Sequence, residues 1–259
     1  MKTLKLGSSD AQVKDLCKFL GIAPRQTFDS GVKAEVLKFQ KEKGLVADGI
    51  VGFNTWKALY LNSRNTRSLV DSDYAWAAKL LDVDLASLRA VLEVETGNKG
   101  GFVAEGKPVI LFEGHVFWKE LKKIGINPEK LRTGNSNILY PTWTREYYKS
   151  GLLEWERLEK ARKINRGAAD SSASWGIFQI MGNNYKAAGC NSVEEFVRLN
   201  TKGELEQLLL GITFIRNNST LLNALRNKDW TTFARIYNGS GQVEAYANKL
   251  RISYKKYLI

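Results

Sequence analysis

Two glutamates near the end of a predicted helix differ in the face that they occupy. Glu95 falls on an apolar face, at the i, i+3, i+4, i+7 spacing that begins at Leu88. Glu93 lies well round from that face, four residues after Arg89, where an exposed ion pair is expected. A carboxyl group on the apolar side of a helix resists ionisation, so its pKa rises, as a general acid working near neutral pH requires. The pattern makes Glu95 a candidate proton donor, with a buried structural glutamate as the alternative.

Two later segments place polar side chains among apolar neighbours. The run SASWGIFQIMG, residues 172–182, contains Gln179, which needs polar partners or a ligand if it is buried. Asp229 is expected to cap a helix that stops at Asn238. Tyr237 and Asn238 then stand at a helix end, apolar below and polar above, where a sugar could be held. A packed turn and a capped core helix are the alternative interpretations.

Short amphipathic helices separated by tight turns precede these segments. Turns at Asp29 and Asp48 each lead into an apolar stretch with helical spacing, and Ser9 is the expected N-cap of an earlier helix. A polar, aperiodic stretch then reads as a linker. We expect a mainly α protein: a small three-helix domain over 1–62, a linker over 63–72, and a helix-rich domain over 73–259. A short β-hairpin is expected within 98–112, where Val103 and the run 109–112 are strand-like.

The first domain carries a specific string of residues, FQ…GL…DGIVG…TW, between Phe39 and Trp56. With an early Leu-Gly-Ser, it resembles the peptidoglycan-binding type 1 domain over residues 3–61. The turn at Asp29 departs from the family pattern, because it reads Asp-Ser-Gly and lacks a full Asp-Gly-x-x-Gly; this can alter the ligand surface while the fold is kept. The resemblance implies peptidoglycan binding, with wall-binding residues Asp48, Gly49, Gly52 and Trp56.

The order of the later motifs is more informative than any one of them. Glu95 after an apolar helix, then SWGIFQI, then YNG, resembles the common core of goose-type lysozymes and lytic transglycosylases. The stretch from about 75 to 257 is similar to the N-acetylmuramidase domain of phage endolysins. The matching pieces are Ala90–Glu95, Gly106–His115, Ala168-Ala169, 172–182, Phe233–Gly239 and Tyr246–Leu250. The resemblance implies that Glu95 is the catalytic acid and that Ser174, Gln179, Tyr237 and Asn238 bind the substrate.

A second carboxylate decides which reaction such a site performs. The family's LFE-x-H piece falls on Leu111–His115, so Glu113 is the candidate and Glu105 the reserve. Gly114 replaces a residue that is more often bulky or basic, which would open the groove locally, and His115 is expected to be structural. With a second carboxylate, water attacks from the opposite face and the anomeric configuration inverts. Without one, the muramic acid's own hydroxyl attacks and forms an anhydro sugar.

The resemblance thus implies an endolysin that hydrolyses the β-1,4 bond between N-acetylmuramic acid and N-acetylglucosamine. The alternative is a lytic transglycosylase, which leaves 1,6-anhydromuramic ends. A non-catalytic wall-binding or virion protein is a further alternative, although the retention of Glu95, Gln179 and Tyr237 together argues against it. An amidase or peptidase is disfavoured, because one His and two unlinked Cys leave it without the usual zinc or Cys–His machinery.

Composition limits the remaining classes of partner. The formal net charge of +12 suits a polyanionic partner such as a cell wall, or a basic solvated surface, and no like-charged run suggests a nucleic-acid arm. Cys17 and Cys190 fall in separate predicted domains, so we expect free thiols. Neither a metal nor another cofactor is expected, and the chain is expected to be a monomer.

The expected location follows from the apolar segments. The first ten residues lack the apolar core of a signal peptide, and no apolar run is long enough to span a bilayer. We expect the protein to stay in the host cytoplasm until the membrane is permeabilised, with release depending on a holin, and then to reach the periplasm and cell wall. The cationic segment 246–259 predicts either a last core helix or a helix that lies on an anionic membrane.

Overall fold

The computed structural model describes residues 1–64, 68–97 and 100–258. These residues form two compact units. One unit holds residues 1–64 and 75–83, and the other holds 68–74 and 84–258. Helix α4 (Asp71–Leu81) therefore contributes its first turn to the second unit and the rest to the first. Among the described residues no helix is long and apolar enough to cross a membrane.

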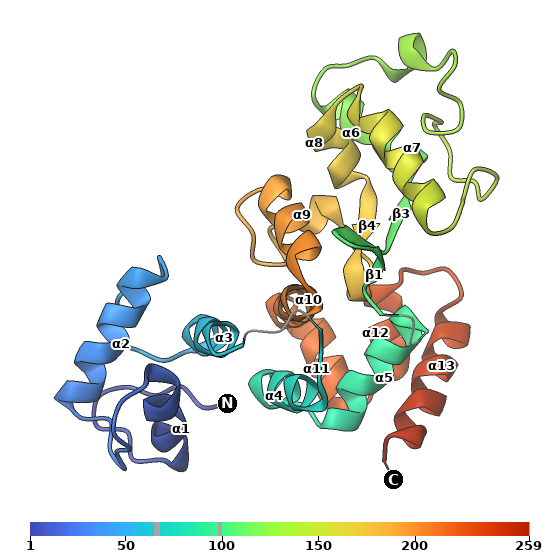
Figure 1. The fold of residues 1–259 in the computed structure, drawn as a ribbon. Coiled ribbons are helices and arrows are strands. Elements are labelled where there is room, and N and C mark those ends of the chain that lie inside the picture. The colour runs from blue at the N-terminus through green and yellow to red at the C-terminus, as the bar shows by residue number, and fades with distance from the viewer. Residues whose placement is uncertain (65–67, 98–99, 259) are drawn as a thin grey trace. The chain divides into compact units, whose positions relative to one another are not determined.

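The first unit is built on three short helices around an apolar core. These are α1 (Ala11–Leu20), α2 (Ser30–Glu42) and α3 (Phe53–Asn62) (Figure 1). The buried residues recur at helical spacing, as Val13, Leu16 and Cys17 do in α1. The N-cap of α1 is Asp10, whose carboxylate accepts from the Gln12 backbone; the expected cap, Ser9, is instead held in a β-bridge to Thr27.

The later turns of α4 extend this core. The ring of Trp76 stacks on Tyr60 of α3, with ring centroids 4.0 Å apart. Both side chains are largely buried, so the contact removes two large aromatic surfaces from water. The apolar core of the first unit thus includes the later turns of α4, a helix that begins within the stretch expected to be a linker.

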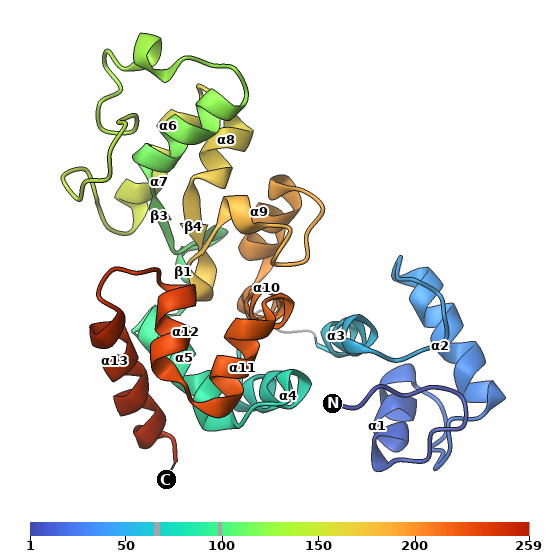
Figure 2. The ribbon, with the colours of Figure 1, turned by 180° about the vertical axis from the view of Figure 1, so that it is seen from behind.

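The second unit surrounds a small sheet with helices. Figures 1 and 2 show α6, α7 and α8 beyond one end of strands β3 and β4, and α5, α12 and α13 beyond the other. The helices are α5 (Leu85–Thr96), α6 (Gly114–Lys123), α7 (Leu152–Arg162), α8 (Arg166–Ser171), α9 (Val193–Lys202), α10 (Glu204–Asn217), α11 (Ser219–Asn227), α12 (Trp230–Tyr237) and α13 (Val243–Lys256). Short 3-10 turns lie at η1 (Pro128–Leu131), η2 (Gly176–Phe178) and η3 (Gly182–Asn184).

The strands are short and antiparallel. A hairpin joins β1 (Phe102–Ala104) to β2 (Lys107–Pro108), as the sequence predicts, while residues 98–99 of the expected span lie outside the described residues. The apolar run that was expected to complete the hairpin, β3 (Ile110–Phe112), pairs instead with β4 (Ala173–Trp175), which pairs in turn with β5 (Ile180–Met181). The sheet therefore joins two of the motifs singled out in the sequence.

The last helix belongs to the core. Ala247, Leu250 and Ser253 of α13 are buried, and the helix packs against α5 and α12. The expectation of a final core helix is thus confirmed, and its apolar face is not free to lie on a membrane. Cys17 and Cys190 are both buried, and no disulfide joins them.

Candidate active site

Glu95 lies in the last turn of α5, partly buried, with its carboxylate toward α13. Asp84 caps the start of this helix and Gly97, in the left-handed conformation, ends it two residues after Glu95. The hydroxyl of Tyr246 donates a hydrogen bond to Glu95 Oε1. Burial raises the pKa of Glu95 to about 7, and the hydrogen bond from Tyr246 only partly opposes that rise. A carboxyl group with this pKa is protonated in part at neutral pH and able to give up its proton.

Tyr237, at the end of α12, links this carboxyl to the turn that carries Gln179. Burial raises the pKa of Tyr237 well above its usual value, and the charge of Glu95 adds to the effect, which places the two groups near one another. The Tyr237 hydroxyl donates to the backbone oxygen of Phe178 at 2.6 Å, while its ring stacks on Phe233. Tyr237 therefore lies near Glu95, and its hydroxyl is already bonded to the backbone of the turn.

The turn after β4 holds Gln179 in an unusual backbone conformation. Its φ is +45°, in the left-handed region that a non-glycine residue adopts at some cost. Its side chain donates to the Gly176 oxygen at 2.8 Å and accepts from the Ser174 hydroxyl at 2.8 Å. Gly176 has φ of +68°, and a Cβ atom there would meet Asn200 Oδ1 at 2.5 Å. Ser174 and Gln179 are thus brought together, in a turn whose polar groups satisfy one another.

Glu113 directly follows β3 and precedes α6, at the end of the strand away from the turn that holds Gln179. Its backbone N–H donates to the oxygen of Ser172, which continues the β3–β4 pairing. The Tyr148 hydroxyl donates to both carboxylate oxygens, at 2.7 and 2.8 Å. His115 Nδ1 lies 3.2 Å from the same carboxylate. Burial, with Glu113 as a second cause, raises the pKa of Tyr148, so its hydroxyl remains a donor.

The neighbourhood of Gly114 differs from the expectation that this glycine opens the groove. A Cβ atom at Gly114 would meet Cε1 of Tyr140 at 2.3 Å, so the ring of Tyr140 already fills the space. The Gly114 N–H donates to the Tyr140 hydroxyl at 3.2 Å, and the ring of His115 stacks over Tyr140. Burial holds the pKa of His115 below its usual value, while Glu113 acts in the opposite sense. The absent side chain therefore admits a tyrosine and leaves no opening.

A buried ion pair that the sequence analysis did not single out fixes the strand before Glu113. Glu154 and Arg157 of α7 are almost fully buried and lie 2.9 Å apart. Glu154 accepts from the N–H of Phe112, and Arg157 donates to the oxygen of the same residue at 3.1 Å. Glu154, Arg157 and Leu158 follow the i, i+3, i+4 spacing of one buried helix face. Two opposite charges on an apolar face were therefore the sequence signal that could have indicated this ion pair.

Glu93, two residues before Glu95, has a different role from the solvent-facing one expected. Its carboxylate accepts from Ser253 and from Lys256, each at 2.9 Å, so it ties α5 to α13. Arg89, the expected partner, instead pairs with Asp71 at 2.6 Å. Helix geometry brings Arg89 and Glu93 to one face, but the neighbouring helices supply other partners for both.

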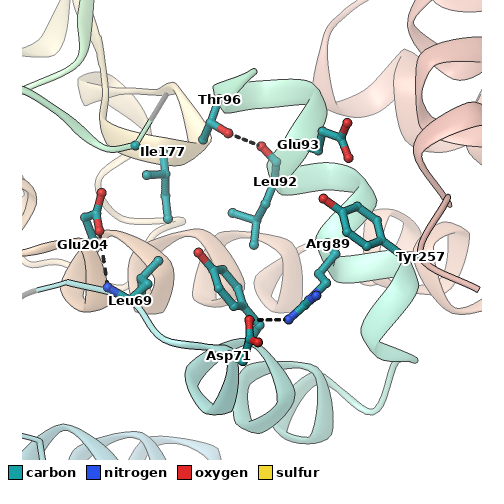
Figure 3. A pocket seen from close by; sticks show the side chains of 11 residues that line it. Leu69, Asp71, Arg89, Leu92, Glu93, Thr96, Ile177, Glu204 and Tyr257 are labelled. Atoms are coloured by element: carbon teal, nitrogen blue, oxygen red, sulfur yellow. Dashed lines mark hydrogen bonds and ion pairs between the residues drawn. The ribbon is translucent and has the colours of Figure 1, made fainter. Parts of the chain in front are cut away.

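Behind α5 lies a cavity of about 360 Å³, drawn in Figure 3. Glu93 lines it and Glu95 is not among its lining residues. Its charged groups are engaged, since Arg89 pairs with Asp71 and Glu204 accepts from the backbone of Leu69. This cavity is therefore separate from the face of α5 that carries the candidate acid.

The remaining predicted residues of the second unit lie at the surface. Glu105 is exposed in the β1–β2 turn, where it lines a cavity with Lys202 of α9 and Glu204 of α10. Its neighbours are thus unlike the tyrosines around Glu95. Asn238 is exposed as the C-cap of α12, one residue beyond Tyr237, and Asp229 caps the start of that helix as predicted.

The four wall-binding candidates of the first unit mostly build its fold. The Trp56 side chain is only 1% exposed and donates to the Lys2 oxygen at 3.0 Å. Gly49 is buried with φ of +72°, and Gly52 precedes α3 as its N-cap. Asp48 is exposed, and it accepts from the N–H of Ile50 in the tight turn. Of the four, Asp48 presents a side chain to solvent.

Within residues 1–64, 68–97 and 100–258, no three His, Cys, Asp or Glu side chains gather in a way that could hold a metal ion.

Comparison with known proteins places both units. Residues 84–258 match the N-acetylmuramidase family, and residues 14–59 match the putative peptidoglycan binding domain. The crystal structure of the Burkholderia AP3 phage endolysin is similar over 99% of each chain, with 37% sequence identity and a TM-score of 0.67. A search of curated proteins finds no match. The chain therefore belongs to the N-acetylmuramidase family, glycoside hydrolases of peptidoglycan, with a peptidoglycan-binding domain preceding the catalytic one.

Proposed function

We propose that Glu95 is the general acid that protonates the leaving oxygen of the β-1,4 bond between N-acetylmuramic acid and N-acetylglucosamine. The observation that carries this is the burial of its carboxyl, which raises the pKa to about 7 beside Tyr246 and Tyr237. Glycoside cleavage needs a proton donor at the leaving group, and a normal glutamate is almost wholly ionised at neutral pH. The surroundings of Glu95 supply that donor.

Glu113 is proposed as the second carboxylate. It lies at the end of β3, the strand paired with β4, whose following turn is bound by Tyr237. In this role the Glu113 carboxylate takes the proton of an incoming water, which attacks from the face opposite the leaving group and inverts the anomeric carbon. Glu105 stays the reserve candidate. Ser174 of β4 and Gln179 of the following turn are proposed to bind the substrate, together with Tyr237 and Asn238 at the end of α12.

The products of digestion test this mechanism. Purified peptidoglycan is digested with the protein and the fragments are identified by mass spectrometry. Hydrolysis leaves reducing muramic acid ends. Products lighter by one water, with 1,6-anhydromuramic ends, would replace the hydrolase proposal by a lytic transglycosylase. Intact glycan strands after prolonged digestion would contradict both.

The first unit is proposed to anchor the protein to peptidoglycan. The proposed boundaries remain those predicted from the sequence: a binding domain that ends at residue 62 and a catalytic domain that begins at residue 73. Because Trp76 stacks on Tyr60, a fragment ending after residue 83 is the one expected to fold and to sediment with insoluble walls. A fragment of residues 1–65 is its control and should be less stable. Part of the attraction is electrostatic and fades with salt. Retention of the longer fragment at high salt indicates a shaped site, and a fragment that stays in the supernatant at low salt contradicts the anchor.

Similarity to a phage endolysin supports a last proposal, on access to the wall. The protein acts as a monomer and reaches its substrate from the host cytoplasm once a separate factor, such as a holin, has opened the membrane. Expression with and without a co-expressed holin, followed by culture turbidity, tests this. Rapid lysis without the holin contradicts it.

A further inference from the structure

An exposed tryptophan stands in direct connection with Glu113. All seven tryptophans of the chain lie in described residues, and Trp143 alone is exposed, at 58% of its surface. A single exposed apolar side chain is ordinary by itself. What distinguishes Trp143 is its partner, because its indole N–H donates to the Tyr148 hydroxyl at 3.1 Å. Tyr148 in turn donates to both oxygens of Glu113.

The segment that carries Trp143 is fixed at both of its ends. The Tyr140 hydroxyl accepts from the N–H of Gly114, next to Glu113. The N–H of Lys149 donates to the carboxylate of Glu154, which also holds the end of β3. The loop 141–149, called here the aromatic loop, is therefore anchored to the same strand end that positions Glu113. Its exposed indole has a defined orientation relative to that carboxylate.

The indole offers a surface that suits a sugar ring. The guanidinium of Arg145 lies 5.5 Å from the ring centroid of Trp143, which supports the indole from one side. A pyranose presents a face of C–H groups that packs against the electron-rich face of an aromatic ring. Its hydroxyl and acetamido groups remain free to meet the polar groups of Arg145 and of the loop backbone.

We propose that Trp143 is a binding platform for a sugar ring of the glycan strand next to Glu113, and that Tyr148 couples this platform to the carboxylate. The inference rests on the proposed function, since it takes Glu113 to face the reacting bond. Tyr148 is a positioning residue in this arrangement: it holds both oxygens of Glu113 and the indole N–H with one hydroxyl. A sugar ring bound on the indole of Trp143 is thereby held in a fixed position relative to the Glu113 carboxylate, the group proposed to activate water.

Binding without turnover gives the first test. The Glu95→Gln variant is titrated with peptidoglycan glycan strands from which the stem peptides have been removed, while tryptophan fluorescence is followed. We expect a fluorescence change that is lost when Trp143→Phe is added, because a phenyl ring at this position would stack on the sugar without the indole signal. A change that persists in full in the double variant would overturn the platform, since another tryptophan would then report the sugar.

Kinetics of soluble glycan strands give the second test. Trp143→Ala is expected to raise KM roughly two- to tenfold, the range of one aromatic contact, with kcat nearly unchanged and Trp143→Phe restoring most of the loss. Tyr148→Phe is expected to lower kcat severalfold, since Glu113 loses its donor. Leu152→Ala, an exposed apolar residue at the start of α7, and Tyr147→Phe are matched controls and should leave both constants unchanged.

Two outcomes separate this inference from the proposed function. If the wild-type protein cuts glycan strands and Trp143→Ala leaves KM and the melting temperature unchanged, the platform is wrong while the muramidase proposal stands. If KM changes only together with a fall in melting temperature, the residue is structural and the inference fails. If the wild-type protein does not cut, the proposed function fails, and the fluorescence titration still decides whether Trp143 binds sugar.

Discussion

Glu95 and Glu113 occupy contrasting surroundings within one catalytic unit. Glu95 is crowded by Tyr246 and Tyr237, with a single hydroxyl donating to it, and burial dominates its pKa. Glu113 accepts two hydrogen bonds from Tyr148 and has His115 3.2 Å away. Crowding by aromatic rings favours the neutral form of the Glu95 carboxyl. The contrast teaches that two identical side chains within one unit receive different hydrogen-bond partners and different burial from their neighbours.

The sharpest way to break this contrast is to remove the proton of Glu95. Glu95→Gln should lower the rate of wall digestion by at least about 10²-fold, because a general acid contributes that much or more. Release of reducing ends from purified walls measures the loss. Glu93→Gln is the matched control on the same helix: it loses an ion pair with an exposed lysine, which contributes little, and should keep its activity. Comparable loss in both variants would contradict the assignment.

Removing the charge of Glu113 tests the second carboxylate of the comparison. Glu113→Gln keeps the shape and can still accept from Tyr148, but it cannot take a proton from water. We expect a loss of roughly 10- to 10²-fold in kcat with KM little changed, measured on the same walls. Glu105→Gln is the matched control, since that residue is exposed in a turn among residues of α9 and α10. If the control loses activity and Glu113→Gln does not, Glu105 takes the second role.

The pH dependence of activity sharpens the comparison. Because the proposed acid, Glu95, has to be protonated to act, kcat/KM should fall as pH rises through about 7. The hydrogen bond from Tyr246 lowers the pKa of Glu95, so Tyr246→Phe raises that pKa further. The falling limb should then move upward by about one pH unit. Tyr254→Phe, on the same helix, should leave the limb in place, and a downward shift in Tyr246→Phe would contradict the proposed acid.

The smallest effect concerns folding stability. Burial raises the pKa of Glu95 from 4.5 in the unfolded chain to about 7 in the folded protein. The folded protein therefore has its full stability below pH 4.5, where Glu95 is protonated in both states, and loses stability as pH rises through about 7. Above pH 7, Glu95→Gln should therefore have a free energy of unfolding higher than that of the wild type by roughly 1–3 kcal/mol. This corresponds to a melting temperature several degrees higher. The two proteins should melt together near pH 4. Thermal unfolding by circular dichroism at both pH values measures this, and equal differences at both would exclude a buried acid.

What the sequence could predict was local. The spacing from Leu88 to Glu95 defines a helix face, and the cap at Asp229 with the stop at Asn238 defines a helix end, because both depend on residues within two or three turns. The partners of the two carboxylates could not be predicted in this way. Tyr246 lies 151 residues from Glu95, and Tyr148 lies 35 residues from Glu113.

Tertiary partners also explain the expectations that were wrong. Glu93 was expected to face solvent beside Arg89, but α13 supplies Ser253 and Lys256. Residues 110–112 of the strand-like run pair with β4, a strand more than 60 residues away in the sequence, and not within the local hairpin. Spacing along the chain predicts which face a residue occupies, and it carries no information on which element will cover that face.

The contact between Glu95 and Tyr246 has a consequence for folding during synthesis on the ribosome. A chain emerging from the ribosome has its acid-bearing helix α5 long before α13, so the carboxyl first exists without the tyrosine that will cover it. Loop closure over so many residues is slow compared with local helix formation. Helix α13 thus completes the surroundings of Glu95, and a nascent or truncated chain without it would keep the other motifs but lack Tyr246 beside this carboxyl.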